Sequence, residues 1–209
     1  MKDTIISVFK ELFRSKDVPY NVPLYKVLER IRVGKSKDIV DLVRKASNKE
    51  EADKIKAGLP CIIFGGEFME RNKNGLTKHS GMMVIDFDKY PTHEIMFEQL
   101  ELLKQNKHIV TLFISPSGIG IKGVVKIPVC DKYEHEKYFK AFGKEFNYDY
   151  FDISNCNVDR VCFESFDPNI YINYEAETYS PILIDSGYEA KDKVPLIPIN
   201  DEDLIIEKI

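Results

Sequence analysis

Residues 82–165 alternate between strand-like and helix-like hydrophobic patterns, and this alternation leaves few possible topologies. Short apolar runs predict strands, and longer segments with apolar residues at three- and four-residue spacing predict helices. The predicted elements, in chain order, are strand 82–88, helix 93–105, strands 109–115 and 121–127, helix 132–146 and strand 160–165. This β-α-β-β-α-β order is typical of the split βαβ unit, with strands arranged 4-1-3-2 and neighbours antiparallel. We therefore expect an α/β protein of the α+β type.

The first sixty residues are predicted to be mainly helical. Residues 5–13 and residues 24–31 both carry apolar side chains at helical spacing. Ser36 is expected to cap a further helix, and Asn48 with Glu51 resembles the capping box of a short fourth one. After these helices, a short strand is expected at residues 61–64, where the hydrophobic pattern changes.

Length and composition fit one substantial domain with an appendage. The chain has 209 residues and a hydrophobic content of 44%. We expect residues 1–60 to form a mainly helical or α/β unit packed on a core of residues 61–180, and residues 181–209 to form an acidic, proline-containing tail or linker. No apolar run approaches the roughly 20 residues that span a bilayer, so we expect a soluble, cytoplasmic protein.

Charge is unevenly distributed along the chain. The formal net charge is −4, which argues against a protein that coats nucleic acid non-specifically. Residues 24–49, however, carry eight Lys or Arg and only three acids. This segment is either a set of ordinary solvated helix faces or one wall of a groove for single-stranded nucleic acid. The candidate contacts are Arg30, Arg32, Lys35 and Lys37, with Tyr20 and Tyr25 nearby for stacking on bases.

Two acids end the first predicted strand of the split βαβ unit. Asp86 and Asp88 are two residues apart, so the period of a strand places both carboxylates on one face and at one end. Carboxylate pairs of this kind hold Mg²⁺ or Mn²⁺, although an Asp-x-Asp pair is also common at a solvated strand end. Asp152 is the expected third acid, because the predicted sheet order brings its segment beside this strand; Asp149 and Asp131 are its rivals.

Further polar residues are expected at the same end of the predicted sheet. Ser117, Gly118 and Gly120 lie in the turn between the second and third strands. Lys122 follows on the third strand, and Arg160 precedes the fourth. Glycines let backbone amides approach phosphate, and the two cations suit phosphate oxygens. Each part also has a simpler interpretation: a plain hairpin turn, a solvated edge lysine, and an arginine that pairs with Asp152 or Asp159. His79 and His108 are interpreted as surface or packing histidines.

Three stretches of the sequence resemble the motifs of the archaeo-eukaryotic primase superfamily, the primase-polymerases. They are Val84-Ile85-Asp86-Phe87-Asp88, the run from Ser117 to Val125, and the later Asp152. The resemblance covers about residues 55–175 and is closest to the primase-like N-terminal domains of virulence-associated-E-type helicases of phages and mobile elements. Two further stretches fit that subfamily: residues 64–68, with the sequence FGGEF, and residues 159–168, with the sequence DRVCFESFDP.

The resemblance implies an RRM-like catalytic sheet with an additional α/β unit. It implies an enzyme that begins or extends nucleic-acid chains on single-stranded DNA, using nucleoside triphosphates and two divalent metals, Mg²⁺ or Mn²⁺, and working with a helicase domain or subunit. By the resemblance, Asp86, Asp88 and Asp152 are the catalytic metal ligands. Ser117, Gly118, Gly120 and Lys122 hold the triphosphate, and Arg160 lies near the nucleotide.

The sequence departs from the family pattern at one position, and other functions stay open. The second family motif commonly ends in His, whereas here the position is Lys122, which keeps a positive charge but lacks the geometry of imidazole. The prediction is template-directed nucleotidyl transfer, as primase, DNA polymerase or both. The alternative is a non-catalytic module for single-stranded nucleic acid or replication initiation. A two-metal nuclease is disfavoured, because it has no triphosphate to hold beside the glycine turn.

Overall fold

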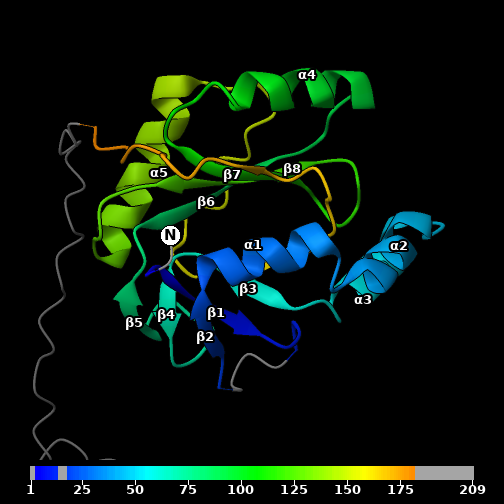
Figure 1. Ribbon diagram of the computed structural model, residues 1–209, viewed down its shortest axis with the longest axis horizontal. Coiled ribbons are helices and arrows are strands. Elements are labelled where there is room, and N and C mark those ends of the chain that lie inside the picture. The colour runs from blue at the N-terminus through cyan, green and yellow to red at the C-terminus, as the bar shows by residue number, and fades with distance from the viewer. Residues whose placement is uncertain (1–2, 14–17, 182–209) are drawn as a thin grey trace, which may run out of the picture.

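The computed structural model describes residues 3–13 and 18–181. Two four-stranded antiparallel sheets lie one above the other in Figure 1, with helix α1 (Leu24–Val33) between them in this view. The buried side of α1 shares one hydrophobic cluster with strands of both sheets. Helices α4 (His93–Leu103) and α5 (Lys132–Phe146) pack on the other face of the upper sheet. The chain is therefore an α+β protein, as the sequence predicts.

The upper sheet contains three of the four strands expected from the split βαβ pattern. Its strands are β6 (Met82–Phe87), β7 (Ile109–Ile114), β8 (Ile121–Lys126) and β10 (Tyr171–Ile172). Their order is β10-β7-β8-β6, and all neighbours are antiparallel. The predicted neighbours 1-3-2 are confirmed as β6-β8-β7. The predicted fourth strand is not beside β6, where only an isolated bridge between Phe87 and Phe151 forms.

The lower sheet corrects two expectations about the fold. Its strands, in the order β2-β1-β3-β9, are β2 (Tyr20–Pro23), β1 (Ile5–Phe9), β3 (Cys61–Ile63) and β9 (Cys162–Phe163). The predicted fourth strand is β9, and it pairs with β3 in this sheet. The helix predicted over residues 5–13 is wrong, because residues 5–9 form β1. A short β-branched run satisfies both periodicities, and pairing with β2 and β3 decides between them.

The remaining elements surround the lower sheet. They are α2 (Lys37–Lys45), α3 (Lys49–Lys56) and a hairpin of β4 (Gly66–Phe68) and β5 (Leu76–His79). The helix expected from the pattern of residues 24–31 is α1, and it ends at Gly34, whose φ of +75° suits a glycine. Asn48 caps α3 as expected, accepting from the backbone of Glu51 at 3.0 Å. Ser36 precedes α2, but its hydroxyl donates to Glu164 and does not cap that helix.

The two faces of β6 enter two different hydrophobic clusters. Met82 and Val84 belong to the cluster with α1, between the sheets. Met83, Ile85 and Phe87 belong to the cluster under α4 and α5. Side chains alternate along a strand, so Asp86 shares the face of Met82 and Val84 and points between the sheets. This fold therefore places the carboxylate of Asp86 at the end of the space between the two sheets.

Two expectations concern the tail of the chain and its division at residue 60. The predicted acidic tail lies outside the described residues from residue 182 onward, and the division of the chain at residue 60 stays a prediction. Strand β1 nevertheless pairs directly with β3, so residues on both sides of that position form one sheet. Over residues 3–13 and 18–181, we find no helix with the length and apolar character needed to cross a bilayer.

Candidate functional site

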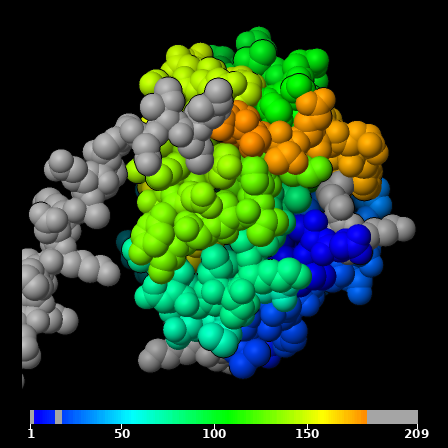
Figure 2. Space-filling view, turned by 90° about the vertical axis from the view of Figure 1, so that its left-hand side faces the viewer, coloured from blue at the N-terminus to red at the C-terminus, as the bar shows by residue number. Residues whose placement is uncertain are grey.

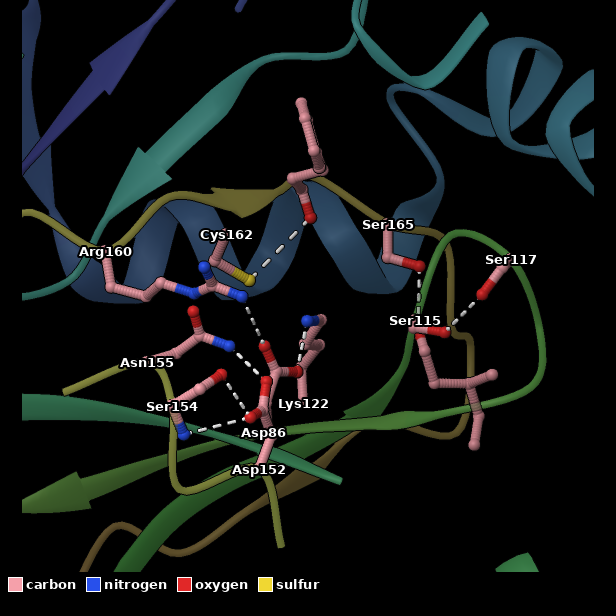
Figure 3. A network of polar contacts seen from close by, with 12 residues as sticks. Asp86, Ser115, Ser117, Lys122, Asp152, Ser154, Asn155, Arg160, Cys162 and Ser165 are labelled. Carbon is pink, nitrogen blue, oxygen red and sulfur yellow. Dashed lines mark hydrogen bonds and ion pairs between the residues drawn. The ribbon is translucent and has the colours of Figure 1, made fainter. Parts of the chain in front are cut away.

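Asp86 is the centre of a polar cluster between the sheets. Its strand register places Lys122 directly opposite on β8, and the Lys122 ammonium forms an ion pair with Oδ1 of Asp86. Arg160, in the segment before β9, brings Nη2 to 3.4 Å from Oδ2 (Figure 3). The Asp86 residue is only 8% exposed, so these two cations balance a carboxylate that has lost most of its water. The solvated-edge interpretation of Lys122 is therefore wrong.

Asp152 reaches Asp86 by a different route from the predicted one. The segment after α5 runs beside the end of β6, where the Asp152 amide donates to the Asp86 carbonyl at 2.9 Å. The Asp152 carboxylate accepts from Ser154 N at 3.0 Å and Ser154 Oγ at 2.6 Å, and it contacts the Asn155 side chain (Figure 3). Burial alone would raise the pKa of Asp152. The hydrogen bonds and the nearby Arg160 outweigh that effect, so its pKa lies below the ordinary value.

The rival acid Asp131 has a separate role. It is the N-cap of α5, where its carboxylate accepts from the amides of Tyr133 and Glu134 at 2.7 and 2.9 Å. Glu134 completes the capping box by accepting from the Asp131 backbone. Asp131 therefore stabilises the start of a helix, whereas Asp152 lies next to Asp86.

Asp88 lies just beyond β6 and is exposed. Its amide donates to the Tyr150 carbonyl at 3.1 Å. Lys89 and Tyr150, which flank this point, both have φ +63°, a conformation that costs non-glycine residues energy and is often found at functional sites. Within the described parts of the chain, no group of three or more His, Cys, Asp or Glu side chains is arranged to hold a metal ion. A metal site formed by Asp86, Asp88 and Asp152 therefore stays a prediction.

The predicted glycine turn joins β7 to β8 as a tight hairpin loop. The Ser115 amide donates to the Gly120 carbonyl at 2.8 Å, and the Gly118 amide donates to the Ser115 carbonyl at 2.9 Å. Gly118 has φ +79°, which explains the glycine. At Gly120, an added Cβ would lie 2.9 Å from the Phe87 carbonyl oxygen, so a side chain there would push the turn away from the end of β6. The turn is therefore held against the strand end that carries Asp86.

The same turn leaves donor groups available. Its hydroxyls interact with each other, with Ser115 Oγ and Ser117 Oγ 3.0 Å apart (Figure 3). Among the residues that the structure describes, neither the Ser117 amide nor the Gly120 amide makes a hydrogen bond. Free amides in a glycine turn are suited to anionic oxygens. The plain-hairpin and phosphate-binding interpretations of this turn are therefore compatible.

Arg44 also contacts this turn, and the sequence did not single it out. Its Nη2 donates to the carbonyls of Phe166 at 2.9 Å and Ser115 at 3.4 Å. A Cβ built on Gly118 would lie 3.6 Å from Arg44 Nε, so the guanidinium rests against the turn. The basic character of residues 24–49 indicates that cations are present in this region. Helical spacing alone does not show which of them contacts a turn about 70 residues later in the sequence.

The four predicted nucleic-acid contacts are not equally available. Arg30 forms two hydrogen bonds, at 2.6 and 2.9 Å, with the fully buried carboxylate of Glu164. Arg32 pairs with Glu29 at 2.5 Å on the exposed face of α1, and Lys37 pairs with Asp41. Arg30 is thus used by the fold, whereas the pairs of Arg32 and Lys37 are exposed and are expected to exchange readily with a polyanion. A nucleic-acid role for Arg30, Arg32, Lys35 and Lys37 stays a prediction.

Comparison with known proteins gives one family match and one similar solved structure. No curated protein matches this chain. The solved AEP domain of the primase-polymerase of cyanophage S-2L aligns with a TM-score of 0.43 and 12% sequence identity, covering 84% of this chain and 83% of that one. The profile of the family described as "BT4734-like, N-terminal domain" matches residues 54–172, which is more than half of the chain and includes Asp86, Asp152, Arg160 and the glycine turn. This chain therefore belongs to the family of BT4734-like N-terminal domains.

Proposed function

We propose that this domain catalyses template-directed nucleotidyl transfer from nucleoside triphosphates to a chain growing on single-stranded DNA. The observation that supports this most is the meeting of Asp86, Asp152, Lys122 and Arg160 at one point between the sheets, next to a glycine turn. Acids for metal, cations for phosphate and free amides are the groups that phosphoryl transfer needs, since positioning and charge neutralisation carry most of its catalysis.

The chemistry of the acids suits a divalent metal, and two of the acids are adjacent in the fold. Carboxylate oxygens are the donors that Mg²⁺ and Mn²⁺ prefer. The backbone hydrogen bond between Asp152 and Asp86 keeps these two residues adjacent, and Asp88 follows two positions later on the same chain segment. Asp86 and Asp152 would hold the metal, with Asp88 joining from the exposed side. When bound, the metal supplies positive charge to the triphosphate and its leaving group.

Lys122 and Arg160 are proposed to change partners when substrate arrives. Without ligands, both cations neutralise Asp86. A metal on Asp86 would replace that positive charge and release Lys122 toward the phosphates at the adjacent turn. Arg160 carries a buried Nε that has no partner within the described residues, so its guanidinium has donor capacity left for a nucleotide.

A second candidate is the non-catalytic module for single-stranded nucleic acid. The observation that favours it is that both carboxylate oxygens of Asp86 already form ion pairs, one with Lys122 and one with Arg160. If that arrangement is permanent, the ion pairs have a structural role, and the carboxylates do not bind metal. The two candidates differ in whether nucleotides are incorporated at all.

The test is incorporation on a single-stranded template. The protein is incubated with a primed and an unprimed template, Mg²⁺ or Mn²⁺, and ribo- or deoxynucleoside triphosphates, and products are separated on a gel. Extension by the parent is expected, and Asp86→Asn is expected to abolish it. Glu98→Gln, which changes an exposed acid of α4, is the matched control and should keep activity. A parent that binds template but incorporates nothing with either metal would leave the binding module as the function.

A further inference from the structure

A pocket lies between α1 and the end of β10, away from Asp86. Its volume is about 520 Å³. The residues that line it come from two segments far apart in the sequence and include Tyr25, Lys26, Leu28, Arg30, Ile172 and Tyr174. In Figure 1 these two segments, the blue α1 and the orange β10, both lie on the side facing the viewer. Tyr25 and Arg30 belong to the basic segment predicted to contact nucleic acid, whereas Ile172 and Tyr174 come from a part of the chain that no motif singles out.

The pocket has an apolar floor and aromatic walls. Leu28 is buried and Ile172 is half-buried, and both belong to the hydrophobic cluster between the sheets. Tyr25 and Tyr174 stand beside them with exposed fractions of 42% and 71%, and within the described residues neither ring packs against another aromatic ring. Two exposed tyrosines at a concave surface suit a flat ligand that can stack on their rings.

The rim of the pocket is positively charged. Lys26 is exposed, and within the described residues it has no ion-pair partner. Arg30 pairs with buried Glu164, and Glu29, the acid of the rim, is paired with Arg32. Lys26 is therefore the cation with free capacity for a ligand. A planar apolar group attached to an anion, which describes a nucleotide unit, matches this combination of rings and charge.

The position of the pocket decides which nucleotide it can take. Strands β10 and β6 are the two edges of the upper sheet, in the order β10-β7-β8-β6. Three inter-strand spacings separate them, roughly 14 Å. A nucleotide in the pocket is therefore not the one that would react at Asp86. A flexible strand of several nucleotides, in contrast, has the length to reach from one to the other.

We infer that this pocket binds a base of single-stranded nucleic acid, which stacks on Tyr25 and Tyr174 while Lys26 contacts the neighbouring phosphate. The identification of that strand as the template or product rests on the proposed function, whereas strand binding itself does not. The pocket thereby extends the interface from the acidic cluster to the opposite edge of the sheet. Stacking accepts every base, so binding with little sequence preference is expected.

The first test measures the affinity for a fluorescent oligothymidylate by anisotropy. The double variant Tyr25→Ala/Tyr174→Ala should bind roughly 5- to 150-fold more weakly, which is the range for losing the stacking of one base. Tyr25→Phe/Tyr174→Phe keeps the rings and should bind within about twofold of the parent. Tyr133→Ala is the matched control, because Tyr133 is 63% exposed and lies on α5, outside the pocket. Equal melting temperatures establish that the variants are folded.

The second test separates charge from stacking. Lys26→Gln should lower the slope of log affinity against log salt by about 0.7, the value for one phosphate contact on a single strand. Lys78→Gln, which changes an exposed lysine of β5 outside the pocket, should leave the slope unchanged. A parent that does not bind the oligonucleotide, or an alanine double variant that binds as tightly as the parent, would overturn the inference.

The outcomes for the pocket and for the proposed function can be told apart. A parent that binds the strand through the tyrosines but incorporates no nucleotide supports the pocket and rejects nucleotidyl transfer. A parent that incorporates nucleotides, with an alanine variant of unchanged strand affinity, rejects the pocket and keeps nucleotidyl transfer. Triphosphate affinity should be the same in all pocket variants, because the pocket and Asp86 lie at opposite edges of the sheet.

Discussion

Lys122 has two possible partners: the Asp86 carboxylate, with which it forms an ion pair, and an anion bound at the adjacent glycine turn. A carboxylate between the sheets needs positive charge nearby, because burial removes the water that would otherwise stabilise it. Lys122 supplies that charge from the opposite position on β8. If a metal takes its place on Asp86, the lysine becomes available to an anion at the adjacent glycine turn. Metal and triphosphate would then favour each other's binding, because linkage is reciprocal.

Replacing Lys122 should therefore affect the two ligands in opposite directions. Lys122→Gln is expected to strengthen Mn²⁺ binding, because the competing ammonium is gone. It should weaken triphosphate binding by about 1.5–3 kcal/mol, the range for a hydrogen bond to a charged group. Titration calorimetry measures both affinities. Lys126→Gln is the matched control, since Lys126 is on the same strand but donates to the Ala176 carbonyl. Unchanged affinity for both ligands in Lys122→Gln would show that the ion pair is structural only.

At the scale of elements, local pattern identified the long segments and the short elements β3 and α3, but it misassigned the short strands β1 and β9. Helices α4 and α5 and the order β6-β8-β7 follow from periodicity in 82–146. Strand β9 has two residues and pairs with β3, about 100 positions earlier, so no local signal gives its sheet. Asp152 was nevertheless placed correctly beside Asp86, although the adjacent element is a loop and not the predicted strand. Arg44 was missed because its contact depends on how α2 packs.

The segment around β9 is fixed mainly by side chains. Glu164 follows β9 and is buried, and it accepts from Arg30 of α1 and from Ser36 ahead of α2. Its amide donates to the Pro60 carbonyl at 2.8 Å. The Ser165 hydroxyl donates to the Ile114 carbonyl. The Asp167 carboxylate accepts from the Ile114 amide at 2.9 Å. The short segment from Glu164 to Asp167 thus connects the helices, the lower sheet and the end of β7.

Removing the arginine of this connection should destabilise the fold. Arg30→Ala leaves the Glu164 carboxylate buried with Ser36 as its remaining side-chain partner, and we expect the free energy of unfolding to fall by about 2–3 kcal/mol. The value is below the usual range for a broken buried pair because Arg30 itself is 45% exposed. Arg32→Ala is the matched control on the same helix: its partner Glu29 is exposed, so a loss below about 1 kcal/mol is expected. Urea unfolding measures both, and equal losses would contradict a special role for Glu164.

At the scale of the whole molecule, two buried histidines join the β4–β5 hairpin to α5. Figure 2 shows the teal segment of the hairpin directly beside the yellow-green α5. His79 Nε2 and His135 Nδ1 are 2.9 Å apart, and both residues are buried, which confirms the packing interpretation of His79. The Gly81 amide donates to His79 Nδ1 at 3.0 Å, so neutral His79 carries its proton on Nε2 and donates it to His135. This network requires both rings to be neutral.

The stability of the protein should therefore fall as the pH drops below about 6.5. Burial lowers the pKa of His79 to about 4 and that of His135 to about 3, from an ordinary value of 6.5. Between those values the unfolded chain binds more protons than the folded one, so acid favours unfolding. Two such groups predict a loss of about 2–4 kcal/mol between pH 7 and pH 5, measured by urea unfolding. His135→Gln keeps a hydrogen-bond acceptor for His79 and should roughly halve this loss. His93→Gln, at an exposed position, is the control and should leave the loss unchanged. A loss that is equal in the parent and His135→Gln would show that acids elsewhere, and not this pair, control the acid response.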